Sequence, residues 1–195
     1  FRNNSIVKQL FKERWVKTNQ LLVAGHSEGS TVAVKMASIN KKITQLIYSG
    51  GNPYGRITTI LEQSRFGETD SLPKGQKVVD HWKNIVANPS QIKYDGGDTF
   101  KATYSFSLPQ RDNLMQLKIP VLITYGTEDW SVAYNDLFQI EAIQQHKRNI
   151  TFKSYVGLEH NYFPKNEKGE IIEEVYNWDK VAGDWRDWLK KAEEN

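Results

Sequence analysis

Residues 21–30 read Leu21-Leu22-Val23-Ala24-Gly25-His26-Ser27-Glu28-Gly29-Ser30. Apolar residues lead into a G-x-S-x-G pattern and a helical pattern follows it, which is typical of a strand, a sharp turn and a helix. The turn would hold Ser27 in a strained backbone, with its hydroxyl exposed at the end of a sheet. Gly25 and Gly29 are expected to leave out side chains that would collide where strand and helix close on the turn. His26 is expected to pack beneath the turn and support it.

The rest of the chain alternates between short apolar runs and helical patterns, which predicts an α/β fold with a mostly parallel sheet. The expected strands cover 20–24, 43–48, 119–125 and 150–156. The expected helices cover 6–16, with Ser5 as its N-cap, and 28–39, 132–145 and 176–191. The strand at 20–24 is almost wholly apolar, as interior strands of a parallel sheet are. We therefore expect it to have a partner strand on each side.

Residues 53–118 interrupt this alternation. They contain helical patterns at 57–66 and 76–87 and no strand pattern, which predicts a mostly helical insertion between core segments 1–52 and 119–195. Insertions of this kind commonly cover an active site, so we expect a cap or lid. Its aromatic residues Phe100, Tyr104 and Phe106 fit the core of a cap as well as a wall that binds substrate. Trp130, outside the insertion, is a further candidate for contact with substrate.

Three residues that could perform acyl transfer each follow an expected strand: Ser27, Asp129 and His160. Because the C-terminal ends of parallel strands lie at one edge of a sheet, we expect their loops to converge. Ser27 would be the nucleophile, and His160 the base that takes its proton and returns it to the leaving group. Asp129 would orient the imidazole. Glu128 is an alternative acid, and Asp129 could instead cap the helix that follows it.

Taken together, segments 25–29, 125–129 and 157–161 resemble the α/β-hydrolase superfamily, in which the catalytic residues follow the same order along the chain. The resemblance implies a serine hydrolase of the esterase, thioesterase or peptidase type, with a cap where 53–118 lies. It implies that the backbone N–H of Glu28 is one donor to the oxyanion. It also implies strands before the nucleophile, so we expect the N-terminal strands of the fold, and the second oxyanion donor, to be missing from this chain.

Composition narrows the range of partners. The net charge is only +3 and charges of both signs are interspersed, which favours a mixed solvated surface over nucleic-acid binding. No apolar run approaches the roughly 18 residues that a membrane-spanning helix requires. The chain has no cysteine and no histidine spacing typical of a metal site, so we expect neither a metal nor another cofactor. The compartment stays open between cytoplasmic and periplasmic or secreted, since the sequence starts at Phe1 and its native N-terminus is expected to be absent.

The most favoured function is hydrolysis of a small-molecule carboxylic ester, or of a thioester, through an acyl-enzyme on Ser27. An ester is preferred because the insertion offers aromatic surface and no cluster of basic side chains that would bind a phosphorylated carrier. A serine peptidase or amidase on the same fold is the alternative, and a non-catalytic binding module is another. An apolar strand with an unpaired edge would also favour association, either with the missing strands or between copies of the chain.

Overall fold

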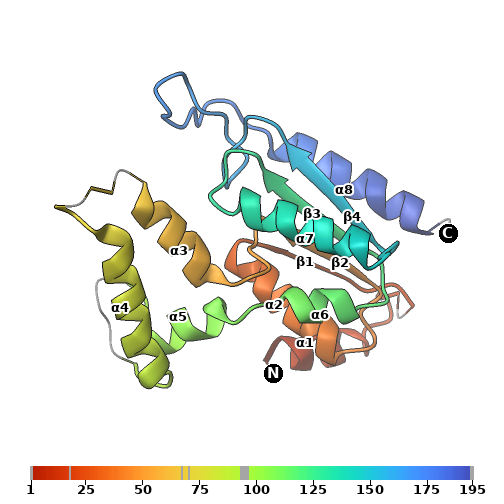
Figure 1. The fold of residues 1–195 in the computed structure, drawn as a ribbon. Coiled ribbons are helices and arrows are strands. Elements are labelled where there is room, and N and C mark those ends of the chain that lie inside the picture. Colours follow the sequence, from red (N-terminus) through yellow and green to blue (C-terminus); the bar gives the residue numbers. More distant parts are fainter. Residues whose placement is uncertain (1, 18, 67, 70, 93–96, 194–195) are drawn as a thin grey trace. The chain divides into compact units, whose positions relative to one another are not determined.

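The computed structural model describes residues 2–17, 19–66, 68–69, 71–92 and 97–193, and Figure 1 shows their arrangement as a ribbon. The strands are β1 (Leu22–His26), β2 (Gln45–Ser49), β3 (Val121–Gly126) and β4 (Ile150–Tyr155). The helices are α1 (Arg2–Leu10), α2 (Glu28–Ile39), α3 (Arg56–Arg65), α4 (Lys74–Ala87), α5 (Phe100–Ser107), α6 (Arg111–Gln116), α7 (Val132–Gln144) and α8 (Trp178–Glu193).

The four strands form one parallel sheet in the order β1-β2-β3-β4. Every residue of β2 and β3 is buried, because each of these strands has a neighbour on both sides. Within the described residues β1 pairs with β2 alone, and its own residues are half-buried or exposed. The apolar strand expected at 20–24 thus lies at an edge of the described sheet, and it extends to His26, directly before the turn.

Helices cover both faces of the sheet, as the alternation of side chains along β4 demonstrates. The ring of Phe152 lies 6.0 Å from that of Phe138 on α7. The next residue, Lys153, points to the other face, where its ammonium lies 2.8 Å from a carboxylate oxygen of Asp184 on α8. Figure 1 shows α7 and α8 on opposite sides of the sheet accordingly. Helix α2 packs against β1 and β2.

The first helix differs from the sequence-based expectation. Helix α1 already begins at Arg2, so Ser5 lies inside it and is not its N-cap, and the helix ends at Leu10. Beyond Leu10 the backbone N–H of Lys12 donates to Gln9, a tighter turn that ends the helix. The helical pattern through 16 was misleading because its apolar side chains are not buried together. Trp15 is 76% exposed.

Residues 52–111 form a compact unit separate from the unit made by 1–51 and 112–195. Within it, α3 packs against α4 and α5. Helix α5 has no counterpart in the sequence-based expectation, and it starts where the side chain of Thr99 accepts a hydrogen bond of 3.1 Å from the N–H of Ala102. The unit ends at Arg111, whereas the sequence pattern extended the insertion to 118. Leu117 belongs to the first unit, where its carbonyl accepts hydrogen bonds from the side chains of Lys147 and Asn149.

The buried centre of the sheet predicts a large difference between two substitutions of the same kind. Ile47 is fully buried in β2, so Ile47→Ala should lower the free energy of unfolding by about 2–5 kcal/mol through lost burial and the cavity left behind. Ile140 on α7 is 53% exposed, and Ile140→Ala should change it by no more than about 0.5 kcal/mol. Denaturant titration of both variants measures the difference, and equal losses would contradict the packing described above.

Candidate active site

The backbone at Ser27 makes the sharp turn between β1 and α2. Its φ of 55° and ψ of −125° lie in a region that costs a non-glycine residue about 1–3 kcal/mol. Two hydrogen bonds hold it there: the N–H of Ser27 donates to the carbonyl of Ser49 at 2.9 Å, and the N–H of Ser30 donates to the carbonyl of Ser27 at 3.0 Å. The turn is therefore tied to the end of β2 and to the first turn of α2.

The two glycines beside Ser27 have different roles. A Cβ on Gly25 would lie 2.0 Å from the carbonyl oxygen of Gly29, so only glycine permits the strand and the helix to approach this closely. A Cβ on Gly29 would meet no heavy atom within 4 Å. The structure therefore requires glycine at position 25, as expected, but not at position 29. It is the backbone of Gly29 that a side chain on Gly25 would strike, whereas the Cβ position of Gly29 itself is open.

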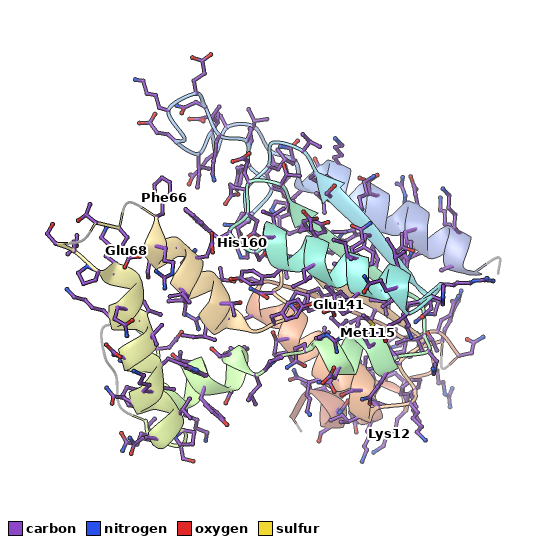
Figure 2. All side chains as sticks on the ribbon, viewed as in Figure 1. Lys12, Phe66, Glu68, Met115, Glu141 and His160 are labelled. Atoms are coloured by element: carbon purple, nitrogen blue, oxygen red, sulfur yellow. The ribbon has the colours of Figure 1, made fainter. Side chains whose placement is uncertain are left out.

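The hydroxyl of Ser27 does not cap the helix that it precedes. A serine at this position normally accepts a hydrogen bond from the helix backbone, and here no such bond is formed. Instead Ser27 Oγ lies 2.9 Å from His160 Nε2. The hydroxyl therefore contacts an imidazole from the loop after β4 and does not cap α2. Figure 2 labels His160, the residue that carries this imidazole.

His160 in turn contacts Asp129, whose side chain is only 3% exposed. His160 Nδ1 lies 2.8 Å from Asp129 Oδ2. A carboxylate can only accept, so Nδ1 carries the proton and Nε2 presents a lone pair to the hydroxyl of Ser27. The other oxygen of Asp129 accepts from the N–H of Ser131 at 2.9 Å. Glu128, the alternative acid, is directed elsewhere, with its carboxylate 4.0 Å from the ammonium of Lys165.

The electrostatics of this chain favour a basic imidazole at His160. The hydrogen bond from His160 to Asp129 raises the pKa of His160 above its usual value of 6.5, and this effect outweighs the partial burial of the ring. The pKa of the neighbouring His26 is lowered, first by burial and then by the charge that His160 can carry. Two imidazoles whose ring centroids lie 5.0 Å apart therefore have pKa values shifted in opposite directions.

The similarity of this chain to known proteins lies in its three-dimensional structure. No family model and no curated protein sequence matches. A ferulic-acid complex of Est1E from Butyrivibrio proteoclasticus is 18% identical with a TM-score of 0.60, over 100% of this chain and 67% of that one. The Pyrococcus furiosus esterase Pf2001 is 15% identical with a TM-score of 0.56, over 98% and 59%. The chain has the α/β-hydrolase fold.

A third structure of this kind is 2,6-dihydroxy-pseudo-oxynicotine hydrolase, 20% identical with a TM-score of 0.53, over 82% of this chain and 39% of the other. The chain thus spans between 39% and 67% of the length of these three structures. At such low identity the similarity concerns the α/β-hydrolase fold alone.

Within this fold, residues that were not among the predicted site residues shape the loop that carries His160. A Cβ on Gly126 would lie 2.1 Å from the carbonyl oxygen of Leu158, so a glycine at the end of β3 lets the loop pass. The buried carboxylate of Glu159 accepts from the N–H groups of Asn161 at 2.7 Å and Phe163 at 3.1 Å. The sequence signal that could have indicated this close approach is Gly126 itself, a glycine at the end of a buried strand.

The other predicted site residues lie as follows. Glu28 is the first residue of α2, where the helix dipole favours negative charge. Trp130 is 36% exposed, and the ammonium of Lys165 lies 6.0 Å from its ring centre.

The three aromatic candidates all lie on α5, in the second unit. Phe100 packs at 5.5 Å against His81, and Tyr104 stacks at 5.9 Å on Trp82. Phe100 and Tyr104 thus make ring contacts inside the second unit, and Phe106 is half-buried. A role of these three residues in binding substrate stays a prediction.

Among the described ranges, no three or more His, Cys, Asp or Glu side chains are grouped so that they could hold a metal ion. In the same part of the chain, no helix combines the length and the apolar character needed to cross a membrane.

The different surroundings of the two glycines predict opposite effects of the same substitution. Gly25→Ala should lower the free energy of unfolding by about 3 kcal/mol or more, because the new methyl group would overlap backbone. Gly29→Ala adds a methyl group in open space within a helix and should raise stability by up to about 1 kcal/mol. Denaturant titration compares the two, and a tolerated Gly25→Ala would contradict the geometry of this turn.

Proposed function

We propose that this chain is a serine hydrolase that cleaves carboxylic esters through an acyl-enzyme formed on Ser27. The observation that carries the proposal is the continuous hydrogen-bonded chain from Ser27 through His160 to the buried Asp129. Each contact has the donor and acceptor that acyl transfer requires, and the backbone at Ser27 is strained in the way expected of a nucleophile.

The acylation step follows from this geometry. Ser27 Oγ attacks the carbonyl carbon of the ester while His160 Nε2 takes its proton, and the carbonyl π electrons move onto the oxygen. The imidazolium formed at His160 is stabilised by the carboxylate of Asp129. The tetrahedral intermediate collapses with loss of the alcohol, to which His160 returns the proton. Ser27 is left as an ester of the acyl group.

Deacylation repeats the same steps with water. His160 takes a proton from the water molecule, the resulting hydroxide attacks the acyl-enzyme, and collapse returns the proton to Ser27 and releases the carboxylic acid. The backbone N–H of Glu28 is our candidate donor to the oxyanion in both steps, since it lies at the start of α2. One such donor typically contributes about 10²–10³ in rate.

An ester is preferred as substrate because one similar structure is described as an esterase and another as bound to ferulic acid, an aromatic carboxylic acid. The second unit, whose helices α4 and α5 carry stacked aromatic residues, is proposed as the cap. Thioesterase and peptidase activities use the same chemistry and are the alternatives. Hydrolysis of acyl esters graded in chain length, compared with matched thioesters and amides, distinguishes the three.

Covalent labelling tests the nucleophile. The protein should react with a fluorophosphonate probe, and mass spectrometry should find the adduct on Ser27. Ser27→Ala should abolish labelling and ester hydrolysis with little change in thermal stability, because only a half-buried hydroxyl is removed. Ser38→Ala is the matched control, since Ser38 lies near the far end of α2, and it should be labelled like the wild type. An adduct on another serine would contradict the proposal.

The raised pKa of His160 predicts the pH dependence of the reaction. His160 acts as a base only when neutral, so labelling should speed up with rising pH, with a midpoint above 6.5. Asp129→Asn removes the cause of the shift and should lower the midpoint, and it should slow the reaction by as much as about 10⁴-fold. Glu128→Gln is the matched control and should change neither. If instead Glu128→Gln moved the midpoint, Glu128 would be the acid.

A further inference from the structure

His26 makes polar contacts on both sides of its ring, although it is not part of the hydrogen-bonded chain described above. It is the last residue of β1 and directly precedes Ser27. Its Nδ1 lies 3.0 Å from the hydroxyl of Ser49, at the end of β2. Its Nε2 lies 3.3 Å from the side-chain oxygen of Asn161, the residue after His160. The ring therefore connects the nucleophile strand, the neighbouring strand and the loop of the catalytic base.

The ring is also closely packed. Its centroid lies 5.0 Å from that of His160 and 5.0 Å from that of Trp178, which meets it edge to face. A Cβ on Gly50, whose φ is 55°, would lie 2.7 Å from His26 Cε1 and 3.4 Å from His160 Cε1. The chain thus keeps a glycine where the two imidazoles approach the backbone, and a shift of His26 would disturb His160.

The hydrogen bonds around His26 have one consistent direction. The Asn161 oxygen can only accept, so Nε2 of His26 carries the proton and Nδ1 accepts from the Ser49 hydroxyl. Ser49 Oγ then accepts from the hydroxyl of Tyr162 at 2.6 Å, and Tyr162 accepts from Thr124 at 2.9 Å. The chain of hydroxyl groups is buried and belongs to β2, β3 and the His160 loop. In the low dielectric of a protein interior, the hydrogen bonds within such a chain polarise and strengthen one another.

This arrangement suits a neutral imidazole. The charged or titratable groups around His26 are His160, Asp129, Glu159 and Tyr162, whose ring centroid lies 5.6 Å from that of His26. Burial, followed by the charge that His160 can carry, lowers the pKa of His26. The lowered pKa of His26 and the hydrogen bond that its Nδ1 accepts from Ser49 both favour the uncharged form of this ring. A second cation beside His160 would oppose the imidazolium that forms there during acyl transfer.

We propose that His26 is a positioning residue: it holds the loop of the catalytic histidine against the nucleophile strand, through Asn161 on one side and the chain from Ser49 to Thr124 on the other. The proposal rests on the proposed function for its kinetic consequences. The positioning itself depends only on the contacts of His26.

Kinetics with two substitutions at this position tests the proposal. His26→Phe keeps a packed ring and removes both hydrogen bonds, so it should slow fluorophosphonate labelling by about 10- to 100-fold through misplacement of His160. For ester hydrolysis, kcat should fall while KM stays unchanged. His26→Gln restores a donor near the position of Nε2 and should recover the rate to within about threefold of the wild type. Trp178→Phe alters the packing against the rings of His26, Tyr162 and Trp185 but removes no polar contact of His26, so it should label at the wild-type rate.

A double-mutant cycle shows whether His26 acts through Asn161. Asn161→Ala alone should slow labelling by a similar factor, and His26→Phe combined with Asn161→Ala should be no slower than either single variant. Additive losses would overturn the proposal, as would wild-type labelling by a folded His26→Phe variant.

Nitrogen-15 NMR of the histidines separates failure of this inference from failure of the proposed function. If the wild type does not react with the probe at all, the proposed function is wrong, and the spectra still report on His26. We expect His26 to be neutral with its proton on Nε2 at pH 7, and the signals of His160 to move in the His26→Phe variant. A proton on Nδ1 of His26, or unchanged His160 signals, would overturn the positioning role.

Discussion

The backbone turn at Ser27 is the constraint on which the other features of the site depend. The residue is held with a φ of 55°, its N–H is bonded to β2, and the glycine before His26 lets the strand pass within contact of α2. The strain of about 1–3 kcal/mol is offset by packing in the surrounding sheet, whose two central strands are wholly buried. Because the hydroxyl is not used as a helix cap, it is available to the imidazole of His160.

The loops that reach this turn approach one another unusually closely, and glycines make the approach possible. Gly126 leaves room for the carbonyl of Leu158, and Gly50 leaves room for the rings of His26 and His160. Beneath these loops, the hydroxyl of Tyr162 forms hydrogen bonds with those of Ser49 and Thr124 in the protein interior. A buried hydroxyl that lost its hydrogen-bond partner would lower the stability of the fold. The network therefore also restricts the position of the His160 loop, which carries Tyr162.

Local sequence patterns predicted most of the core elements of the α/β-hydrolase fold. Helix α2 has the bounds expected from its pattern, and the expected strands at 119–125 and 150–156 agree with β3 and β4 to within two residues. The pattern was wrong for α1, whose apolar side chains find no common buried face, and it missed α5 and α6. Periodicity reports which residues could share a face and not whether another element covers that face, which explains the error at α1. Helices α5 and α6 are only 8 and 6 residues long, too short to show a clear period.

By itself, the sequence determined the parallel sheet, the turn at Ser27 and the three residues that follow strand ends, because these depend on local backbone preferences and on the direction of the strands. Only the tertiary structure decided that Asp129 and not Glu128 contacts His160, since adjacent residues in a loop differ in orientation and not in spacing along the chain. The contacts of His26 also arise only in three dimensions. Its partners Ser49 and Asn161 lie 23 and 135 residues away, and folding of the sheet is what brings them to one ring.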